Sequence, residues 1–252
     1  MIKEIHQFCA GFAYGDAISN QALAIQKFLR QHGFISEIYS EQFYGNEAIP
    51  SFRFSDSKNS LILYHHSFPT DFLIKKIHKS QSILIYHNIT PPEYVEPYNR
   101  NLAATLKRAK DDLAKYKDKF QFALADSAYN ESELRELGIQ NTMVMSVAGR
   151  PLNPVRKHPA LSYLYDGRTN VLFVGRIFPN KRHQDLLKTF YFFNKIHPYA
   201  RLIIAGGFHP SVRGYACELN NLMFELGIQN SVVWTGPITD EELSEIYYGS
   251  HL

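Results

Sequence analysis

Short apolar runs alternate with amphipathic helical patterns along most of the chain. In the first half, the apolar runs that predict strands lie at residues 2–8, 35–39, 61–64, 82–86, 122–125 and 142–147. In the second half they lie at 171–174, 202–205 and 232–234, and helical patterns follow them, ending at about 196, 226 and 248. Strands that alternate with helices are typical of βαβ units and a parallel sheet. The pattern therefore predicts an α/β protein.

The periodicity weakens between Ala148 and Thr169, where three prolines fall in a stretch with no clear apolar repeat. Such a stretch is typical of a connection between domains. We predict a first domain at 1–148, a linker at 149–169 and a second domain at 170–252.

Composition narrows the class of protein. The chain has 252 residues, 45% of them hydrophobic, and a formal charge of +3, which is too small to argue for nucleic acid as a partner. Cys9 and Cys217 lie far apart and match no metal or redox spacing, which favours free thiols in a reducing compartment. No signal-like segment follows the start, and no apolar stretch approaches the ~18 residues of a membrane span. We expect a cytoplasmic protein that needs no metal.

The loop after 171–174 is a candidate anion site. Gly175 ends the apolar run, and Arg176 and Lys181 follow before a helical pattern begins. Cations beside the N-terminus of a helix, with its free N–H groups, suit a phosphate or diphosphate. The alternative is that both are ordinary solvated charges on a βα loop.

A glycine loop also precedes the first helix. Gly11 and Gly15 lie there, and Asp16, Ser19 or Asn20 could cap the helix. The spacing is not that of a dinucleotide fingerprint, and no P-loop occurs in the sequence. The residues alone fit a capped βα unit as well as a ligand loop.

Three histidines follow predicted strands. His65 and His66 end the run at 61–64, and because adjacent side chains on a strand point to opposite faces, a paired metal site is disfavoured. The simplest alternative is one structural and one exposed histidine. His87 follows 82–86 and precedes Asn88, Thr90 and two prolines, at a carboxyl end where ligands of α/β sheets gather. It too could be structural.

The helical pattern at 101–120 carries many lysines on its polar side. Such a face could contact anionic lipid, although the aspartates among the lysines also fit a plain solvated surface.

Six segments carry a resemblance to a known family. They are FAYGDAISNQALAIQKFLRQHGF, LYHHSF, IYHNITPPEY, VGRIFPNKR, LIIAGGFHPS and VVWTGPITDEELSEIYYGSHL. In order and spacing the last three resemble the nucleotide-binding half of the retaining glycosyltransferases called glycosyl transferases group 1, and the first three resemble its acceptor-side half. The resemblance implies a GT-B fold, with two Rossmann-like domains facing a cleft. It also implies sugar transfer with retention from a UDP-sugar or GDP-sugar to an acceptor hydroxyl, as in polysaccharide or glycoconjugate synthesis.

The resemblance also implies roles for individual residues. Arg176 and Lys181 would hold the diphosphate and support catalysis, and His87 would reach the transferred sugar. Gly15 and Asp16 would face the donor phosphates. The positions that would seat the base and ribose are Gly206, Gly207, Pro237 and Ile238, and those on the acceptor side are His65, His66, Asn88 and Thr90. The partners would be a nucleotide-sugar and a carbohydrate or lipid-linked acceptor, with no cofactor and with possible peripheral contact at the inner face of the membrane.

One family feature has no counterpart in the sequence. In the family, a loop with two spaced glutamates follows the segment that ends here in YYGSHL, and nothing in the chain matches it. We therefore expect an incomplete second domain, and a chain that by itself transfers no sugar. The rival interpretations are a non-catalytic sugar- or nucleotide-binding module and, less well supported because the fingerprint is absent, a dinucleotide oxidoreductase.

Overall fold

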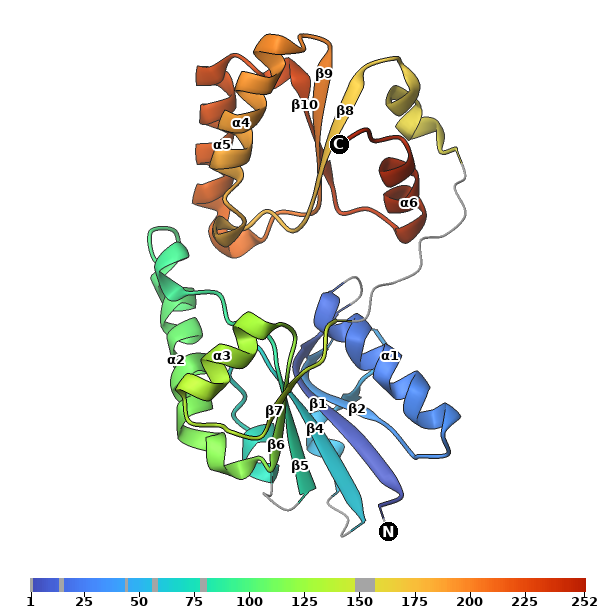
Figure 1. The fold of residues 1–252 in the computed structure, drawn as a ribbon, viewed down its shortest axis with the longest axis vertical. Helices are drawn as coiled ribbons and strands as arrows, with labels where there is room; N and C mark the ends of the chain where they lie inside the picture. The colour runs from blue at the N-terminus through green and yellow to red at the C-terminus, as the bar shows by residue number, and fades with distance from the viewer. Residues whose placement is uncertain (1, 14–15, 44, 56–58, 78–80, 148–156) are drawn as a thin grey trace. The chain divides into compact units, whose positions relative to one another are not determined.

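The computed structural model describes residues 2–13, 16–43, 45–55, 59–77, 81–147 and 157–252. Contacts divide the chain into two compact units. The first is Met1–Thr90 with Ala104–Gly149, and the second is Pro91–Ala103 with Arg150–Leu252 (Figure 1). Within the described ranges, no helix combines the length and the apolar content needed to cross a membrane.

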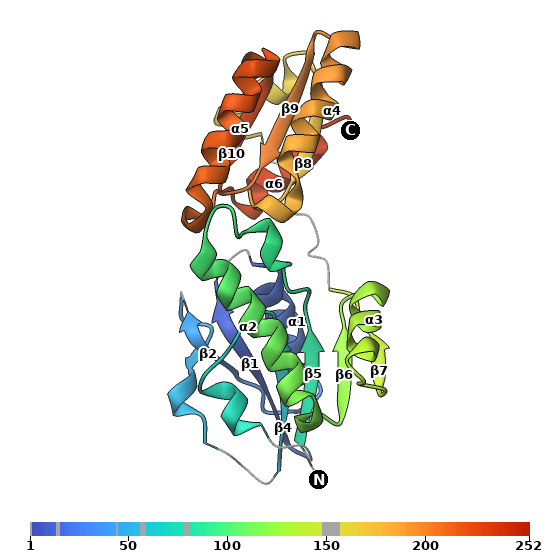
Figure 2. The ribbon, with the colours of Figure 1, turned by 90° about the vertical axis from the view of Figure 1, so that its left-hand side faces the viewer.

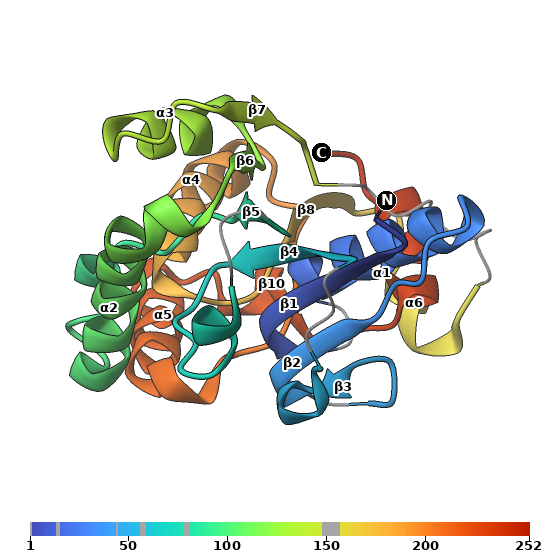
Figure 3. The ribbon, with the colours of Figure 1, turned by 90° about the horizontal axis from the view of Figure 1, so that it is seen from below.

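The first unit is built on a parallel sheet with the order β3-β2-β1-β4-β5-β6-β7, which Figure 3 shows from one end. Its strands are β1 (Glu4–Phe12), β2 (Ile38–Phe43), β3 (Ile49–Pro50), β4 (Ser60–His66), β5 (Ser82–Tyr86), β6 (Phe122–Ala125) and β7 (Thr142–Val144). All neighbouring strands pair in parallel, as βαβ connections require.

Helices cover both faces of this sheet (Figure 1). α1 (Ala17–Gln31) lies on one face, and α2 (Arg100–Tyr116) and α3 (Ala128–Glu136) lie on the other. The Asp16 carboxylate caps α1 by accepting from Ser19 N, and the Ser127 hydroxyl caps α3 by accepting from Asn130 N. With both faces covered, the central strands β4 and β5 are almost wholly buried.

The second unit has a parallel sheet with the order β10-β9-β8. Its strands are β8 (Thr169–Val174), β9 (Ala200–Ala205) and β10 (Val232–Gly236). α4 (His183–Ile196) and α5 (Arg213–Leu226) lie side by side on one face, as Figures 1 and 2 show, and α6 (Asp240–Tyr248) lies on the other. Along the other edge of β8, His251 N donates to Asn170 O and Leu172 N donates to Leu252 O. β8 therefore has a backbone partner on each side.

The predicted elements hold best where apolar runs are continuous. The strands at 82–86 and 122–125 have the predicted bounds, and the last helix ends as predicted. β4, β8, β9 and β10 extend further than predicted, β1 lies later than the predicted 2–8, and β7 ends at Val144 rather than at residue 147. The second strand was placed too early, since β2 begins only at Ile38.

Part of the predicted linker is folded. Residues 148–156 lie outside the described part of the chain, but Pro159–Tyr165 forms a 3-10 helix. Leu161 and Leu164 of this helix are buried in one cluster with Ile203 and Ile246. They anchor the segment to the second unit because burying each leucine side chain stabilises by about 1.5–3 kcal/mol.

Candidate functional site

In the second unit, three loops converge at the carboxyl edge of the sheet. Gly175 N donates to Ala205 O at 2.9 Å, and Ile177 N donates to Gly207 O at 3.0 Å, so the loop after β8 continues alongside the loop after β9. Gly206 has φ +153°, and a Cβ there would lie 2.1 Å from the carbonyl oxygen of Gly175. Only glycine allows this approach.

Arg176 lies at the end of β8 with its side chain exposed. Its guanidinium carbon is 4.8 Å from the centre of the Phe178 ring. Burial, and then the positive charge of Arg176, lowers the pKa of His209. Phe178 and His209 also meet edge to face, with ring centres 6.0 Å apart. Arg176 thus lies over the Phe178 ring, which in turn contacts His209 of the loop after β9.

Lys181 ends a 3-10 turn, Pro179–Lys181, just before α4. Arg182 follows with φ 53° in the left-handed region, and α4 starts at His183. His183 is fully buried, and burial together with the charge of Lys181 lowers its pKa to about 4. The Lys181 charge therefore lies close to the first turn of α4.

The three cations of this loop differ in their partners. Arg182 pairs with Asp185 in the first turn of α4. Among the described residues, no carboxylate forms an ion pair with Arg176 or with Lys181. Two uncompensated cations next to the positive end of a helix dipole favour an anion at this edge.

The loops after β9 and β10 also touch. A Cβ on Gly207 would lie 3.1 Å from the Pro237 ring, and Pro237 is exposed. The Ile238 side chain packs instead against the buried cluster around Leu161. Gly206, Gly207 and Pro237 are therefore placed at one edge with Arg176, whereas Ile238 mainly serves the core. Their contact with a base or ribose stays a prediction.

In the first unit the histidines lie in the interior. His65 and His66 are each 1% exposed, so the expectation that one of them is exposed is wrong. Their side chains do point to different partners, because His66 Nε2 donates to Ala109 O at 2.9 Å while His65 bonds to Gln7 and His87. Burial lowers the pKa of His66 to about 4 despite the bond to the Ala109 carbonyl, with a further lowering by His87.

His87 is 2% exposed, and both of its ring nitrogens have partners. Nδ1 lies 2.6 Å from Asp126 Oδ2, and Nε2 lies 2.9 Å from His65 Nδ1. Asn88 is exposed and its amide donates to Asn130 Oδ1, and Thr90 is half-buried. Contact of His87 with a sugar, and of His65, His66, Asn88 and Thr90 with an acceptor, stays a prediction.

The glycine loop before α1 is only partly described. Gly15 lies outside the described residues. Asp16 Oδ2 accepts hydrogen bonds from Ser19 N at 3.0 Å and from Ser19 Oγ at 3.1 Å. The carboxylate thus caps the helix, as one of the two interpretations of this loop expects.

Two members of the buried histidine network were missed from the sequence. Asp126 directly follows the strand at 122–125, so its place beside His87 could have been inferred from adjacent carboxyl ends. Gln7 lies inside β1 and carries no comparable signal. Within the described ranges, no group of three or more His, Cys, Asp or Glu side chains is placed to hold a metal ion.

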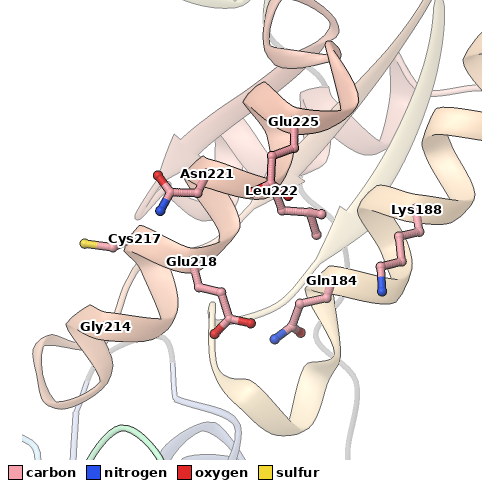
Figure 4. Close-up of a pocket in the computed structure, with 8 residues that line it drawn as sticks. All are labelled: Gln184, Lys188, Gly214, Cys217, Glu218, Asn221, Leu222 and Glu225. Atoms are coloured by element: carbon pink, nitrogen blue, oxygen red, sulfur yellow. The ribbon is translucent and has the colours of Figure 1, made fainter.

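A groove of about 460 Å³ lies between α4 and α5 (Figure 4). The side chains that line it include Gln184, Lys188, Cys217, Glu218 and Glu225, which mix both signs of charge. None of the predicted site residues lines this groove. The candidate anion site is therefore the loop edge rather than the helix face.

Known proteins are similar to this chain in sequence family and in fold. Residues 157–252 match the family described as Glycosyl transferases group 1. WaaG, a glycosyltransferase involved in lipopolysaccharide biosynthesis, has a similar structure with a TM-score of 0.65 and 10% identity, over 98% of this chain and 73% of WaaG. Sucrose-phosphate synthase from Thermosynechococcus elongatus gives a TM-score of 0.67 and 15% identity over 98% of this chain and 74% of its own. HepE from Anabaena, in complex with UDP and glucose, gives 0.60 and 15% over 98% and 72%. No curated protein matches the sequence. The chain therefore has an α/β fold of the GT-B type, and its residues 157–252 match the glycosyl transferases group 1.

Proposed function

We propose that the chain belongs to an enzyme that transfers a sugar from a nucleoside diphosphate sugar to an acceptor hydroxyl with retention. We further propose that Arg176 and Lys181 bind the donor diphosphate. The observation that carries the proposal is the pair of uncompensated cations at the end of β8. The structure of HepE with UDP and glucose supports a nucleotide as the anion, because HepE is similar to this chain.

The topology supports the same place. β9 pairs with one edge of β8, and residues 251–252 pair with the other edge. β8 thus lies between β9, the next strand in sequence, and residues 251–252, which come much later in the chain. In open α/β sheets, ligands bind outside the carboxyl ends of the strands at such a switch point. Arg176 is the second residue after β8 ends.

The chemistry follows from charge. Breaking the bond between the sugar and the diphosphate leaves negative charge on the departing oxygen. Fixed cations stabilise that charge more in the transition state than in the bound donor. Arg176 offers several N–H donors in a planar fork, whereas Lys181 offers a compact point charge beside the helix start. The proposal needs no metal in this role.

Binding measurements test the donor site with three matched variants. Arg176→Gln and Lys181→Gln each remove one uncompensated cation, whereas Arg182→Gln removes the neighbouring cation that Asp185 already pairs. A charge-assisted bond is worth about 1.5–3 kcal/mol, so calorimetry with UDP and GDP should show binding at least about tenfold weaker for the first two. The Arg182→Gln protein should bind like the wild type. Unchanged binding in both site variants, with wild-type binding intact, would refute the assignment.

Turnover separates the enzyme from a binding module. We also propose a hexose donor, a carbohydrate or lipid-linked acceptor, a cytoplasmic location and peripheral contact with the membrane. UDP- and GDP-sugars should be tested with both kinds of acceptor. Since the family's glutamate loop has no match in residues 1–252, the assay needs a protein that carries such a loop as well as this chain. Tight nucleotide binding with no transfer in either protein would favour the non-catalytic module.

A further inference from the structure

A continuous line of buried polar side chains crosses the sheet of the first unit. It joins Gln7 on β1, His65 on β4, His87 after β5 and Asp126 after β6, and these four strands are consecutive neighbours in the sheet. Gln7, His65 and His87 are at most 2% exposed, and the Asp126 side chain is 16% exposed. With so little access to water, these side chains depend on hydrogen-bond partners inside the protein.

The amide of Gln7 fixes the direction of hydrogen-bond donation along the line. Its Nε2 donates to the carbonyl oxygen of Ala22 at 2.8 Å. A carbonyl can only accept, so the other end of the amide, Oε1, faces His65 Nε2 at 3.0 Å. Oε1 is also only an acceptor. His65 Nε2 must therefore carry a hydrogen.

His65 passes this direction on to His87. Full burial lowers the pKa of His65 well below its usual value, so His65 is neutral and has a single ring hydrogen. Because that hydrogen is on Nε2, Nδ1 is a bare acceptor. Its partner at 2.9 Å, His87 Nε2, must then donate.

The last contact holds a second hydrogen. His87 Nδ1 and Asp126 Oδ2 are 2.6 Å apart, a separation that requires a hydrogen between them. His87 already has one hydrogen on Nε2, so the pair holds one proton more than a neutral imidazole beside a carboxylate. We propose that His87 is an imidazolium paired with the Asp126 carboxylate, and that Gln7 and His65 are the positioning residues that impose this state.

His66, on the same strand as His65, is the other titratable group near His87, and burial lowers its pKa to about 4. Its own Nε2 hydrogen goes to Ala109 O, so it takes no part in the line. In the imidazolium state His87 has no lone pair and cannot act as a general base. This inference concerns the folded chain alone and does not rest on the proposed function.

Nuclear magnetic resonance of protein labelled with ¹⁵N in its histidines tests the proposal. At neutral pH, the imidazole spectrum should show His65 protonated on Nε2 only and His87 protonated on both nitrogens, with signals assigned by His65→Gln and His87→Gln. In Gln7→Leu the direction is no longer imposed, and His87 should lose one ring hydrogen. Gln26→Leu is the matched control, because buried Gln26 also donates to a backbone carbonyl, Ser36 O at 3.1 Å, but forms no hydrogen bond with a histidine among the described residues.

Two results would overturn the proposal. The first is a wild-type spectrum in which His87 has only one protonated ring nitrogen. The second is a Gln7→Leu protein whose His87 signals match those of the wild type and of Gln26→Leu. If Gln7→Leu does not fold, the wild-type spectrum alone decides, since it reads the two tautomers directly.

Discussion

Replacing Gly206 with alanine should distort the loop after β8, which carries Arg176, and should lower the stability of the second unit. The new Cβ would lie 2.1 Å from the Gly175 carbonyl oxygen and 2.7 Å from its carbon. Real Cβ contacts essentially never fall below 3.0 Å, so the two backbones would have to part by 0.9 Å. That movement would stretch the adjacent bond from Gly175 N to Ala205 O, now 2.9 Å, beyond hydrogen-bonding range.

A second glycine separates the free-energy cost of the steric clash from the cost of backbone strain. Gly227 ends α5 with φ 67°, and a Cβ there would meet nothing within 4 Å. Gly227→Ala should therefore cost only the left-handed conformation, about 1–2 kcal/mol. Gly206→Ala should add about 1 kcal/mol for the lost hydrogen bond and about 1–3 kcal/mol for overpacking. We expect a total of about 3–6 kcal/mol.

The chain contains a convenient probe for this measurement. Trp234 is its single tryptophan and lies in β10, next to the loops in question. Urea unfolding followed by tryptophan fluorescence should give a clearly lower midpoint for Gly206→Ala than for Gly227→Ala, and UDP binding should weaken only in the former. Equal midpoints for the two variants would refute the argument from close approach.

Three further predictions concern stability and reactivity. The pKa of His66 is about 4 when folded and near 6.5 when unfolded, so the unfolded chain binds more protons between these values. His66 should therefore contribute about 3 kcal/mol of stability that is present above pH 6.5 and is lost as pH drops to 4; in urea unfolding followed by circular dichroism, His66→Gln should remove this part of the slope and leave the parts due to buried His65 and His183. Asn170→Leu should destabilise the second unit by about 3 kcal/mol in the fluorescence assay, because the buried amide bonds two backbone carbonyls and accepts from Arg201. A thiol reagent should label exposed Cys217 in the folded protein but not Cys9, whose pKa is raised by burial and then by the charge of Asp16; rapid labelling of two thiols by mass spectrometry would contradict this.

The strands were predictable to the extent that burial made them uniformly apolar. β5 and β6 read as continuous apolar runs, and their bounds were found. β4 and β8 extend further because buried polar residues, among them His65 and Asn170, complete them. A polar side chain within a strand is stable there only when partners from other elements satisfy it. Those partners are set by the fold and are not visible in a local window.

The two parts of the candidate site differ in the same way. Arg176 and Lys181 could be proposed from the sequence because the anion-binding pattern is local: a strand, a glycine, cations and a helix start within a few residues. The histidine network joins Gln7, His65 and Asp126, which are separated by dozens of positions and meet only through the strand order. Sequence patterns placed His87 at a strand end but could not show that its nitrogens are already engaged.

This engagement sets a condition on any contact between His87 and a ligand. If the His87 ring turned away, Asp126 Oδ2 and His65 Nδ1 would lose their hydrogen-bond donors, at a cost of about 1–3 kcal/mol for each buried group. Asp126 Oδ1 already lacks a hydrogen-bond partner among the described residues, so its own bonds would not compensate the carboxylate for the donor lost at Oδ2. A ligand that recruits His87 must therefore replace both bonds or admit water to them. A substrate that contacts only the surface of the loop after β5 would leave His87 in place and would contact exposed Asn88 first.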